Sequence, residues 1–217
     1  MKYKAAIFDL DGTLIDTAND IKFYINMILK RYSFPEISSD NIHSLLGGGL
    51  KNAITQALAG AEKDEKKIDL YVKELINEYL KNPVIETHFY KGIDTLLEKI
   101  KQTKIKIAVF SNKDHRITEK IIDIIFGKKI FDIVRGSMEG IPKKPDPAGA
   151  ILIAEKLGFS PEEMLYLGDS DIDCITAKNG GFKFIATLWG YRTKKQIADA
   201  GAELFISKPL ELIDFFE

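Results

Sequence analysis

The chain has 217 residues, of which 45% are hydrophobic and 10% aromatic, enough for one substantial core and a small second domain. Its 31 Lys and Arg residues nearly balance its 32 Asp and Glu residues, so no global field favours nucleic acid or an anionic membrane as a partner. The one cysteine, Cys174, excludes an internal disulfide. No apolar run approaches the roughly 20 residues of a membrane span. No signal-peptide pattern opens the chain, so we expect a cytoplasmic protein.

The first predicted element is an apolar strand over residues 5–8 that leads directly into two carboxylates, Asp9 and Asp11. In open α/β sheets, ligands bind in the crevice at the carboxyl ends of the strands, where both acids would lie. A turn alone explains Asp11 and Gly12 but leaves Asp9 without a role. The pattern Asp-x-Asp-Gly-Thr, which ends at Thr13, therefore favours a chemical site over a plain turn.

Residues 16–83 show helical periodicity and no convincing strand, with Ile21 and Ile25 on one helical face. This stretch is far longer than an ordinary crossover between two strands, so we expect it to form a small all-helical cap domain. The cap would leave the core after the first strand and return before the second, and two such connections make a natural hinge. The predicted domains are a core of residues 1–15 and 84–217 and a cap of residues 16–83.

Three consecutive glycines, Gly47, Gly48 and Gly49, lie within the predicted cap. They are consistent with a helix end followed by a flexible turn. They are also consistent with a loop that faces a substrate, because a glycine loop can present backbone N–H groups to an anion. We expect the second role and leave open whether the loop recognises the substrate or only gates access to it.

Further apolar strands are predicted after the cap, with helical segments between them. Strands that are apolar on both faces and joined by helical crossovers predict a parallel sheet with helices on both faces. Helix starts are marked by Asp146-Pro147 and by Ser160-Pro161 with Glu163. The predicted strands cover residues 105–110, 164–167, 182–187 and 203–206.

Polar residues that could bind phosphate follow the first of these later strands. Ser111 and Asn112 stand between this strand and the next helix. A hydroxyl and backbone N–H groups at such a position suit a phosphate oxygen, although a plain helix cap would use the same residues. Lys144 precedes Pro145 and is therefore expected in an extended loop rather than along a helix. Each of these signals is weak when taken alone.

A second group of acids, Asp169, Asp171 and Asp173, follows the strand at residues 164–167. Two unit charges 4 Å apart repel by about 4 kcal/mol at an effective dielectric of 20, so acids gathered at adjacent strand ends need compensation. Mg2+ would supply it together with Lys144, because this ion is typically held by one or two carboxylates and by substrate phosphate oxygens.

Together these residues resemble the motifs of the haloacid dehalogenase superfamily, in its phosphatase branch with a helical cap after the first strand. The resemblance extends over essentially the whole chain and implies a Rossmann-like parallel core. Within the family the chain is most similar to phosphoglycolate phosphatase-like proteins, although it has Gly-Gly-Gly in the cap where such proteins often carry Gly-Asn-Gly. The superfamily motifs stand here as Asp9-Leu10-Asp11-Gly12-Thr13, Ser111, Lys144 and Gly168-Asp169-Ser170-Asp171-Ile172-Asp173, and the subfamily likeness rests on residues 14–17, 47–49, 144–147 and 189–191.

This resemblance also implies a mechanism. Asp9 would attack phosphorus and form an aspartyl-phosphate, while Asp11 would act first as a general acid and then as a general base. Asp9, Asp169 and the backbone oxygen of Asp11 would hold Mg2+. Asp173 would support the water shell of the metal or Lys144.

The same resemblance implies a set of groups that hold the transferring phosphoryl oxygens. Ser111, Lys144 and the backbone N–H groups around Gly12 and Thr13 would serve this purpose, because the reaction is catalysed mainly by positioning and charge stabilisation. Asn112 would orient neighbouring groups.

The favoured function is therefore a Mg2+-dependent phosphatase that acts on a small phosphorylated metabolite, with neither nucleic acid nor a membrane as partner. A sugar phosphomutase of the β-phosphoglucomutase type would also form an aspartyl-phosphate. A signalling receiver phosphorylated on Asp9 is the alternative from another class, although the long helical insert argues against it. The sequence leaves open whether the protein is a monomer or a homodimer.

Overall fold

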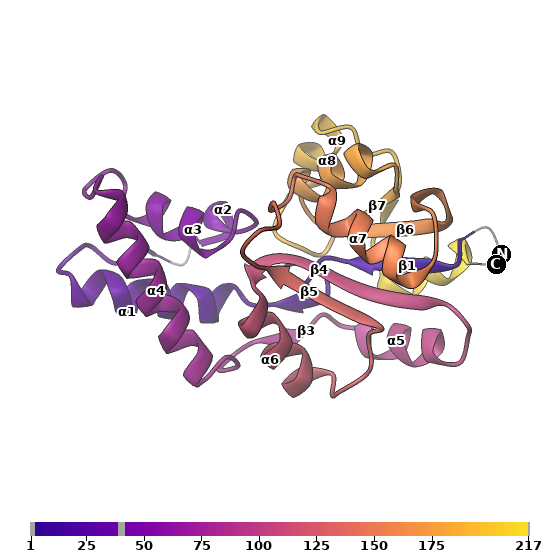
Figure 1. Ribbon diagram of the computed structural model, residues 1–217, viewed down its shortest axis with the longest axis horizontal. Coiled ribbons are helices and arrows are strands. Elements are labelled where there is room, and N and C mark those ends of the chain that lie inside the picture. The colour runs from indigo at the N-terminus through magenta and orange to yellow at the C-terminus, as the bar shows by residue number, and fades with distance from the viewer. Residues whose placement is uncertain (1–2, 39–41, 217) are drawn as a thin grey trace.

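The computed structural model describes residues 3–38 and 42–216. Its core strands are β1 (Ala5–Phe8), β4 (Lys106–Asp114), β5 (Ile133–Ser137), β6 (Met164–Gly168), β7 (Lys183–Thr187) and β8 (Phe205–Ile206). They form one parallel sheet in the order β5-β4-β1-β6-β7-β8 (Figure 1). The α/β core predicted from the sequence is confirmed.

β1 lies in the middle of the sheet, between β4 and β6. Its side chains are at most 1% exposed, as expected for a strand that is apolar throughout. Successive side chains of a strand point to opposite faces. Ala6 and Phe8 accordingly pack into one hydrophobic cluster, and Ala5 and Ile7 pack into another. Both faces of the sheet are therefore covered, and the polar residues that follow β1 emerge at its carboxyl end.

Helices cover the two faces of the sheet separately. One face packs against α5 (Ile93–Lys101), α6 (His115–Ile125) and the 3-10 segment η3 (Pro209–Phe215). The other face packs against α7 (Ala148–Leu157), α8 (Asp171–Gly180) and α9 (Lys194–Asp199). This arrangement confirms the predicted three-layer core.

In the part of the chain that the structure describes, residues 18–81 fold into four helices that extend from one end of the core (Figure 1). Their apolar face is built from residues spaced three and four apart, such as Ile21, Ile25 and Ile28, all of which are buried. These helices are α1 (Ala18–Arg31), α2 (Ile42–Leu45), α3 (Leu50–Ala57) and α4 (Glu65–Lys81).

The two connections to these helices lie side by side. They pair as a short antiparallel ribbon of β2 (Ile15–Asp16) and β3 (His88–Phe89). The segment that leads from α4 back to the core is held against α1 by Asp20, because the Asp20 carboxylate accepts hydrogen bonds from the N–H groups of residues 85–87. We propose that the chain divides as the sequence predicts, into a core of residues 1–15 and 84–217 and a cap of residues 16–83.

Several elements differ from the sequence predictions. β4 continues to Asp114, so Ser111 and Asn112 lie within the strand rather than after it. β2, β3 and β5 were not predicted. The Ser160-Pro161 signal starts only the 3-10 turn η2 (Pro161–Glu163), because the chain enters β6 at Met164. Among the described residues, no helix has the length and apolar character needed to cross a membrane.

Candidate active site

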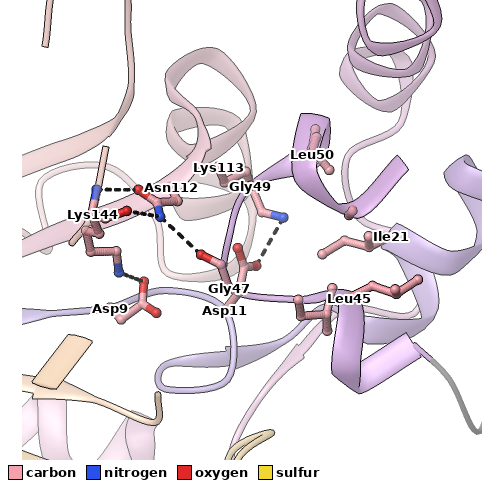
Figure 2. A pocket seen from close by; sticks show the side chains of 12 residues that line it. Asp9, Asp11, Ile21, Leu45, Gly47, Gly49, Leu50, Asn112, Lys113 and Lys144 are labelled. Atoms are coloured by element: carbon pink, nitrogen blue, oxygen red, sulfur yellow. Dashed lines mark hydrogen bonds and ion pairs between the residues drawn. The ribbon is translucent and has the colours of Figure 1, made fainter. Parts of the chain in front are cut away.

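A cavity lies between the carboxyl end of the sheet and the cap (Figure 2). Its polar wall comes from the core and its apolar wall mainly from α1, α2 and α3. The cavity volume is about 30 Å³, which exceeds the roughly 10–15 Å³ that one water molecule needs but is too small for a phosphate ester. A substrate therefore needs the cap or the lining side chains to move. The lining residues are Asp9, Asp11, Ile21, Leu45, Leu46, Gly47, Gly49, Leu50, Ala53, Asn112, Lys113 and Lys144.

Lys144 joins two carboxylates on the core side of the cavity. Its Nζ lies 2.8 Å from Oδ1 of Asp9 and 2.7 Å from Oδ1 of Asp173, and all three residues are buried. Burial acts to lower the pKa of Lys144, but the carboxylates of Asp173 and Asp9 outweigh burial and raise it. The pKa of Asp9 is raised, first by burial and then by repulsion from Asp173. Lys144 alone therefore does not offset the burial and repulsion that disfavour the charged form of Asp9, and a further cation would favour that form.

Asp169, which directly follows β6, is the third buried acid of this group. Its Oδ1 accepts a hydrogen bond from Thr13 Oγ1 at 3.3 Å, and its Oδ2 accepts one from the backbone N–H of Tyr191 at 2.7 Å. Burial, followed by repulsion from Asp173, raises the pKa of Asp169 to about 7. Carboxylate oxygens of Asp9, Asp169 and Asp173 lie within 4.8 Å of one another. Such a set of hard oxygen donors with uncompensated charge fits a divalent cation such as Mg2+.

Two glycines allow the chain to approach Asp169 closely. Gly12 has a φ of 87°, a left-handed conformation that suits glycine, and a Cβ at this position would overlap the Asp169 carboxylate. A Cβ at Gly190 would overlap both Asp169 and the main-chain oxygen of Gly12. The Asp-Gly-Thr turn after β1 and the Trp-Gly-Tyr segment after β7 therefore both pack closely against the Asp169 carboxylate.

Asp11 faces the cavity from the other side of this turn. Its Oδ1 accepts a hydrogen bond from Thr17 Oγ1 at 2.6 Å and lies 3.1 Å from Nζ of Lys113. Lys113 is buried, and its Nζ also lies 5.0 Å from the centre of the Tyr79 ring in α4. Lys113 was not singled out as a site residue from the sequence. It stands two residues after Ser111 in a strand beside β1, which is the signal that could have identified it.

Asn112 connects the core to the predicted cap loop. Its Nδ2 donates hydrogen bonds to the carbonyl oxygens of Gly47 and Lys144, both at 3.1 Å, and its Oδ1 accepts one from the N–H of Lys144 at 2.9 Å. Arg192 adds a second connection, with a 2.7 Å hydrogen bond from its Nη2 to the carbonyl oxygen of Leu46. The cap loop is therefore held against the core through its carbonyl groups.

The structure brings most of the predicted site residues together. Asp9, Asp11, Asn112 and Lys144 line one cavity with Gly47 and Gly49, whereas Asp169, Asp173, Gly12 and Thr13 adjoin it through the contacts above. Ser111 and Gly48 are not among its lining residues. The hydroxyl of Ser111 accepts a hydrogen bond from the N–H of Lys113 at 3.1 Å. Gly48 packs against Asn52.

The raised pKa of Asp169 predicts a pH-dependent stability of the metal-free protein. From about pH 4 to about pH 7, Asp169 keeps its proton in the folded protein, whereas the unfolded chain has released it. The free energy of unfolding therefore decreases with rising pH over this range. The contribution of Asp169 to stability is full at low pH and is lost as the pH rises through 7. Asp169→Asn removes the titration. With EDTA present, the melting temperature of Asp169→Asn relative to wild type should rise between about pH 5 and pH 8. A constant difference would contradict the assignment.

Comparisons with known proteins identify the family. The sequence profile of the haloacid dehalogenase-like hydrolases matches residues 6–187. The chain is 35% identical to a phosphoglycolate phosphatase of Aquifex aeolicus, over 99% of this chain and 97% of that one. It is 27% identical to an N-acetylmuramic acid 6-phosphate phosphatase of Pseudomonas aeruginosa, over 100% of this chain and 96% of that one.

A solved structure extends the likeness to three dimensions. The crystal structure of a protein described as a putative phosphoglycolate phosphatase from Lactobacillus delbrueckii subsp. bulgaricus superposes with a TM-score of 0.90 at 28% identity, covering 99% of this chain and 98% of that one. The chain therefore belongs to the haloacid dehalogenase-like hydrolase family and is a phosphatase of its phosphoglycolate phosphatase-like group, as the sequence motifs predicted.

Proposed function

We propose that this phosphatase hydrolyses a small phosphomonoester in two steps, through an aspartyl-phosphate on Asp9, with Mg2+ as cofactor. The observation that carries the proposal is the position of Asp9 at the cavity, at the end of β1, with Nζ of Lys144 2.8 Å from its Oδ1. A carboxylate held in this way can act as a nucleophile, and covalent catalysis divides one difficult displacement into two easier ones.

In the first step, an oxygen of Asp9 forms a bond to phosphorus and the bond from phosphorus to the alkoxide oxygen breaks. Asp11 donates its proton to the departing oxygen and then accepts a proton from the water that hydrolyses the acyl phosphate, which regenerates both residues. The 2.6 Å hydrogen bond from Thr17 and the ion pair with Lys113 fix the Asp11 carboxylate. Asp11 also lines the cavity and therefore faces the reacting groups.

Charge stabilisation comes from groups around Asp9. Lys144, Ser111 and the N–H groups of Gly12 and Thr13 are proposed to hold the phosphoryl oxygens. Asn112 orients Lys144, since it both accepts a hydrogen bond from the backbone of Lys144 and donates one to it.

Asp9, Asp169 and the backbone oxygen of Asp11 are the proposed ligands of Mg2+. The bound ion would neutralise charge on the phosphoryl oxygens and on the acidic cluster. Asp173 is proposed to support Lys144 and the water molecules bound to the metal. Its two carboxylate oxygens accept hydrogen bonds from Lys144 at 2.7 Å and from Ser170 at 2.6 Å, which fixes its orientation.

The substrate is proposed to be small, with 2-phosphoglycolate as the first candidate. A cap on two paired connections can close over a small ligand and exclude water, but it would clash with a phosphorylated protein or a polynucleotide. The two curated relatives described above are named for phosphorylated acids. We also propose that the protein acts in the cytoplasm on a free metabolite, without nucleic acid or a membrane as partner.

A panel of phosphate esters tests this proposal. With Mg2+, phosphate release from 2-phosphoglycolate should have a kcat/KM at least about 10-fold above that from 2-hydroxyethyl phosphate, which replaces the carboxylate by a neutral group of similar size. Glucose 6-phosphate should also be a poorer substrate. Release of phosphate from none of these esters would contradict the proposal. Conversion of glucose 1-phosphate to glucose 6-phosphate would instead favour a phosphomutase.

A further inference from the structure

A second buried cation, Lys113, faces the cavity and has no role in the chemistry described above beyond its contact with Asp11. Only 3% of Lys113 is exposed. Its Nζ lies 3.1 Å from Oδ1 of Asp11, and the two side chains approach each other across the cavity wall in Figure 2. A buried ammonium group is costly unless it meets negative charge, so its position restricts what the cavity can bind favourably.

The two lysines of the cavity are placed differently. Lys144 already contacts two carboxylates, those of Asp9 and Asp173. Lys113 contacts one, that of Asp11, among the ion pairs of the described residues. Lys144 therefore belongs with the nucleophile, whereas Lys113 can accept a further anionic partner.

Lys113 also lies where the core meets the cap. Its ammonium group lies over the ring of Tyr79, a fully buried residue of α4, in the geometry of a cation–π contact. The cap side of the cavity is apolar, with Ile21, Leu45 and Leu50 in its wall. An anionic group that extends from a phosphate at Asp9 toward the cap thus meets hydrocarbon on one side and Lys113 on the other.

We propose that Lys113 determines substrate specificity by pairing its ammonium group with a carboxylate on the substrate, next to the phosphoryl group that Asp9 attacks. The proposal rests on the phosphatase function proposed above and adds the residue that recognises the tail of the ester. Asp9 and Lys113 line the same cavity, so the carboxylate is expected to lie only a few bonds from phosphorus. Tyr79 is a positioning residue that holds Lys113 in place when the cap is closed.

The test compares two substrates that differ only in the tail, 2-phosphoglycolate and 2-hydroxyethyl phosphate. Lys113→Met should lower kcat/KM for 2-phosphoglycolate by about 10- to 100-fold, the scale of one charged hydrogen bond. Because Lys113 also contacts Asp11, 2-hydroxyethyl phosphate should be slowed as well but by a smaller factor, so the preference for 2-phosphoglycolate should fall by about 10-fold or more. Lys113→Arg keeps the charge and should retain most of the preference. Lys143→Met is the matched control, because Lys143 is an exposed lysine next to the cap loop that does not line the cavity.

Tyr79 gives a second, independent test that does not depend on the folding of Lys113→Met. Tyr79→Leu removes the ring and should raise KM for 2-phosphoglycolate selectively. Tyr79→Phe keeps the ring and should leave KM unchanged, because the Tyr79 hydroxyl has no hydrogen-bond partner among the described residues.

The outcomes separate this inference from the proposed function. If Lys113→Met slows both substrates equally, Lys113 acts on Asp11 or on the fold, and the specificity proposal is overturned while the phosphatase function stands. A wild-type enzyme that hydrolyses both esters without preference overturns it as well. If the wild type hydrolyses neither ester with Mg2+, the proposed function fails and the role of Lys113 fails with it.

Discussion

Asp9→Asn should abolish turnover, lowering kcat/KM by at least about 10⁴-fold, as expected when the nucleophile of a covalent mechanism is removed. An amide cannot form the acyl phosphate, so phosphate release and the phosphoenzyme should disappear together. The fold should persist, because the neutral amide relieves the burial and the repulsion from Asp173 that raise the pKa of Asp9. Steady-state phosphate release and the melting temperature measure the two effects.

The matched control for this variant is Asp199→Asn, which removes an exposed carboxylate of α9. It should leave the rate unchanged. Turnover near the wild-type rate in Asp9→Asn would exclude Asp9 as the nucleophile. A collapse of the melting temperature would instead mean that Asp9 is needed for the fold.

Removal of the metal should have the second-largest effect. Excess EDTA should abolish activity and added Mg2+ should restore it, because the acidic cluster needs a cation before an anionic phosphate can approach Asp9. Asp169→Ala should require at least about 10- to 100-fold more Mg2+ for half-maximal rate, or show no rescue, since even groups that only support metal ligands have effects of this size. The measurement is the rate as a function of Mg2+ concentration.

Asp171→Asn provides the control for the metal experiment. The Asp171 side chain is 48% exposed, and its carboxylate is not part of the cluster formed by Asp9, Asp169 and Asp173. Its Mg2+ dependence should match that of wild type. Full activity of the wild-type protein in excess EDTA would exclude the proposed metal site.

Much of the core could be predicted because its strands carry a strong local signal. Residues 5–8 and 164–167 are apolar throughout, and the structure has strands at Ala5–Phe8 and Met164–Gly168. β5 escaped prediction because Arg135 and Gly136 interrupt its apolar pattern. These residues are stabilised by pairing with β4, which is a contact between segments distant in sequence.

The candidate site was predictable to the extent that its residues follow strands of one parallel sheet. Asp9 and Asp169 come directly after β1 and β6, which are neighbours, so their approach follows from the topology. The role of Lys113 could not be derived in this way. Its position depends on the continuation of β4 beyond Phe110 and on the ring of Tyr79. The strand continues to Asp114, which pairs with Ser137 of β5, and the ring comes from α4, so both depend on contacts between segments that are distant in sequence.

The central claim is that the phosphoryl group passes through Asp9, and the most direct measurement is to locate it on the protein. Wild-type protein mixed with 2-phosphoglycolate and Mg2+ and quenched in acid within one turnover should carry one phosphoryl group on the peptide that contains Asp9. Treatment with hydroxylamine should remove it, as expected for an acyl phosphate. A phosphoryl group on another residue, or phosphate release at the full rate with no phosphoenzyme at any quench time, would contradict the account.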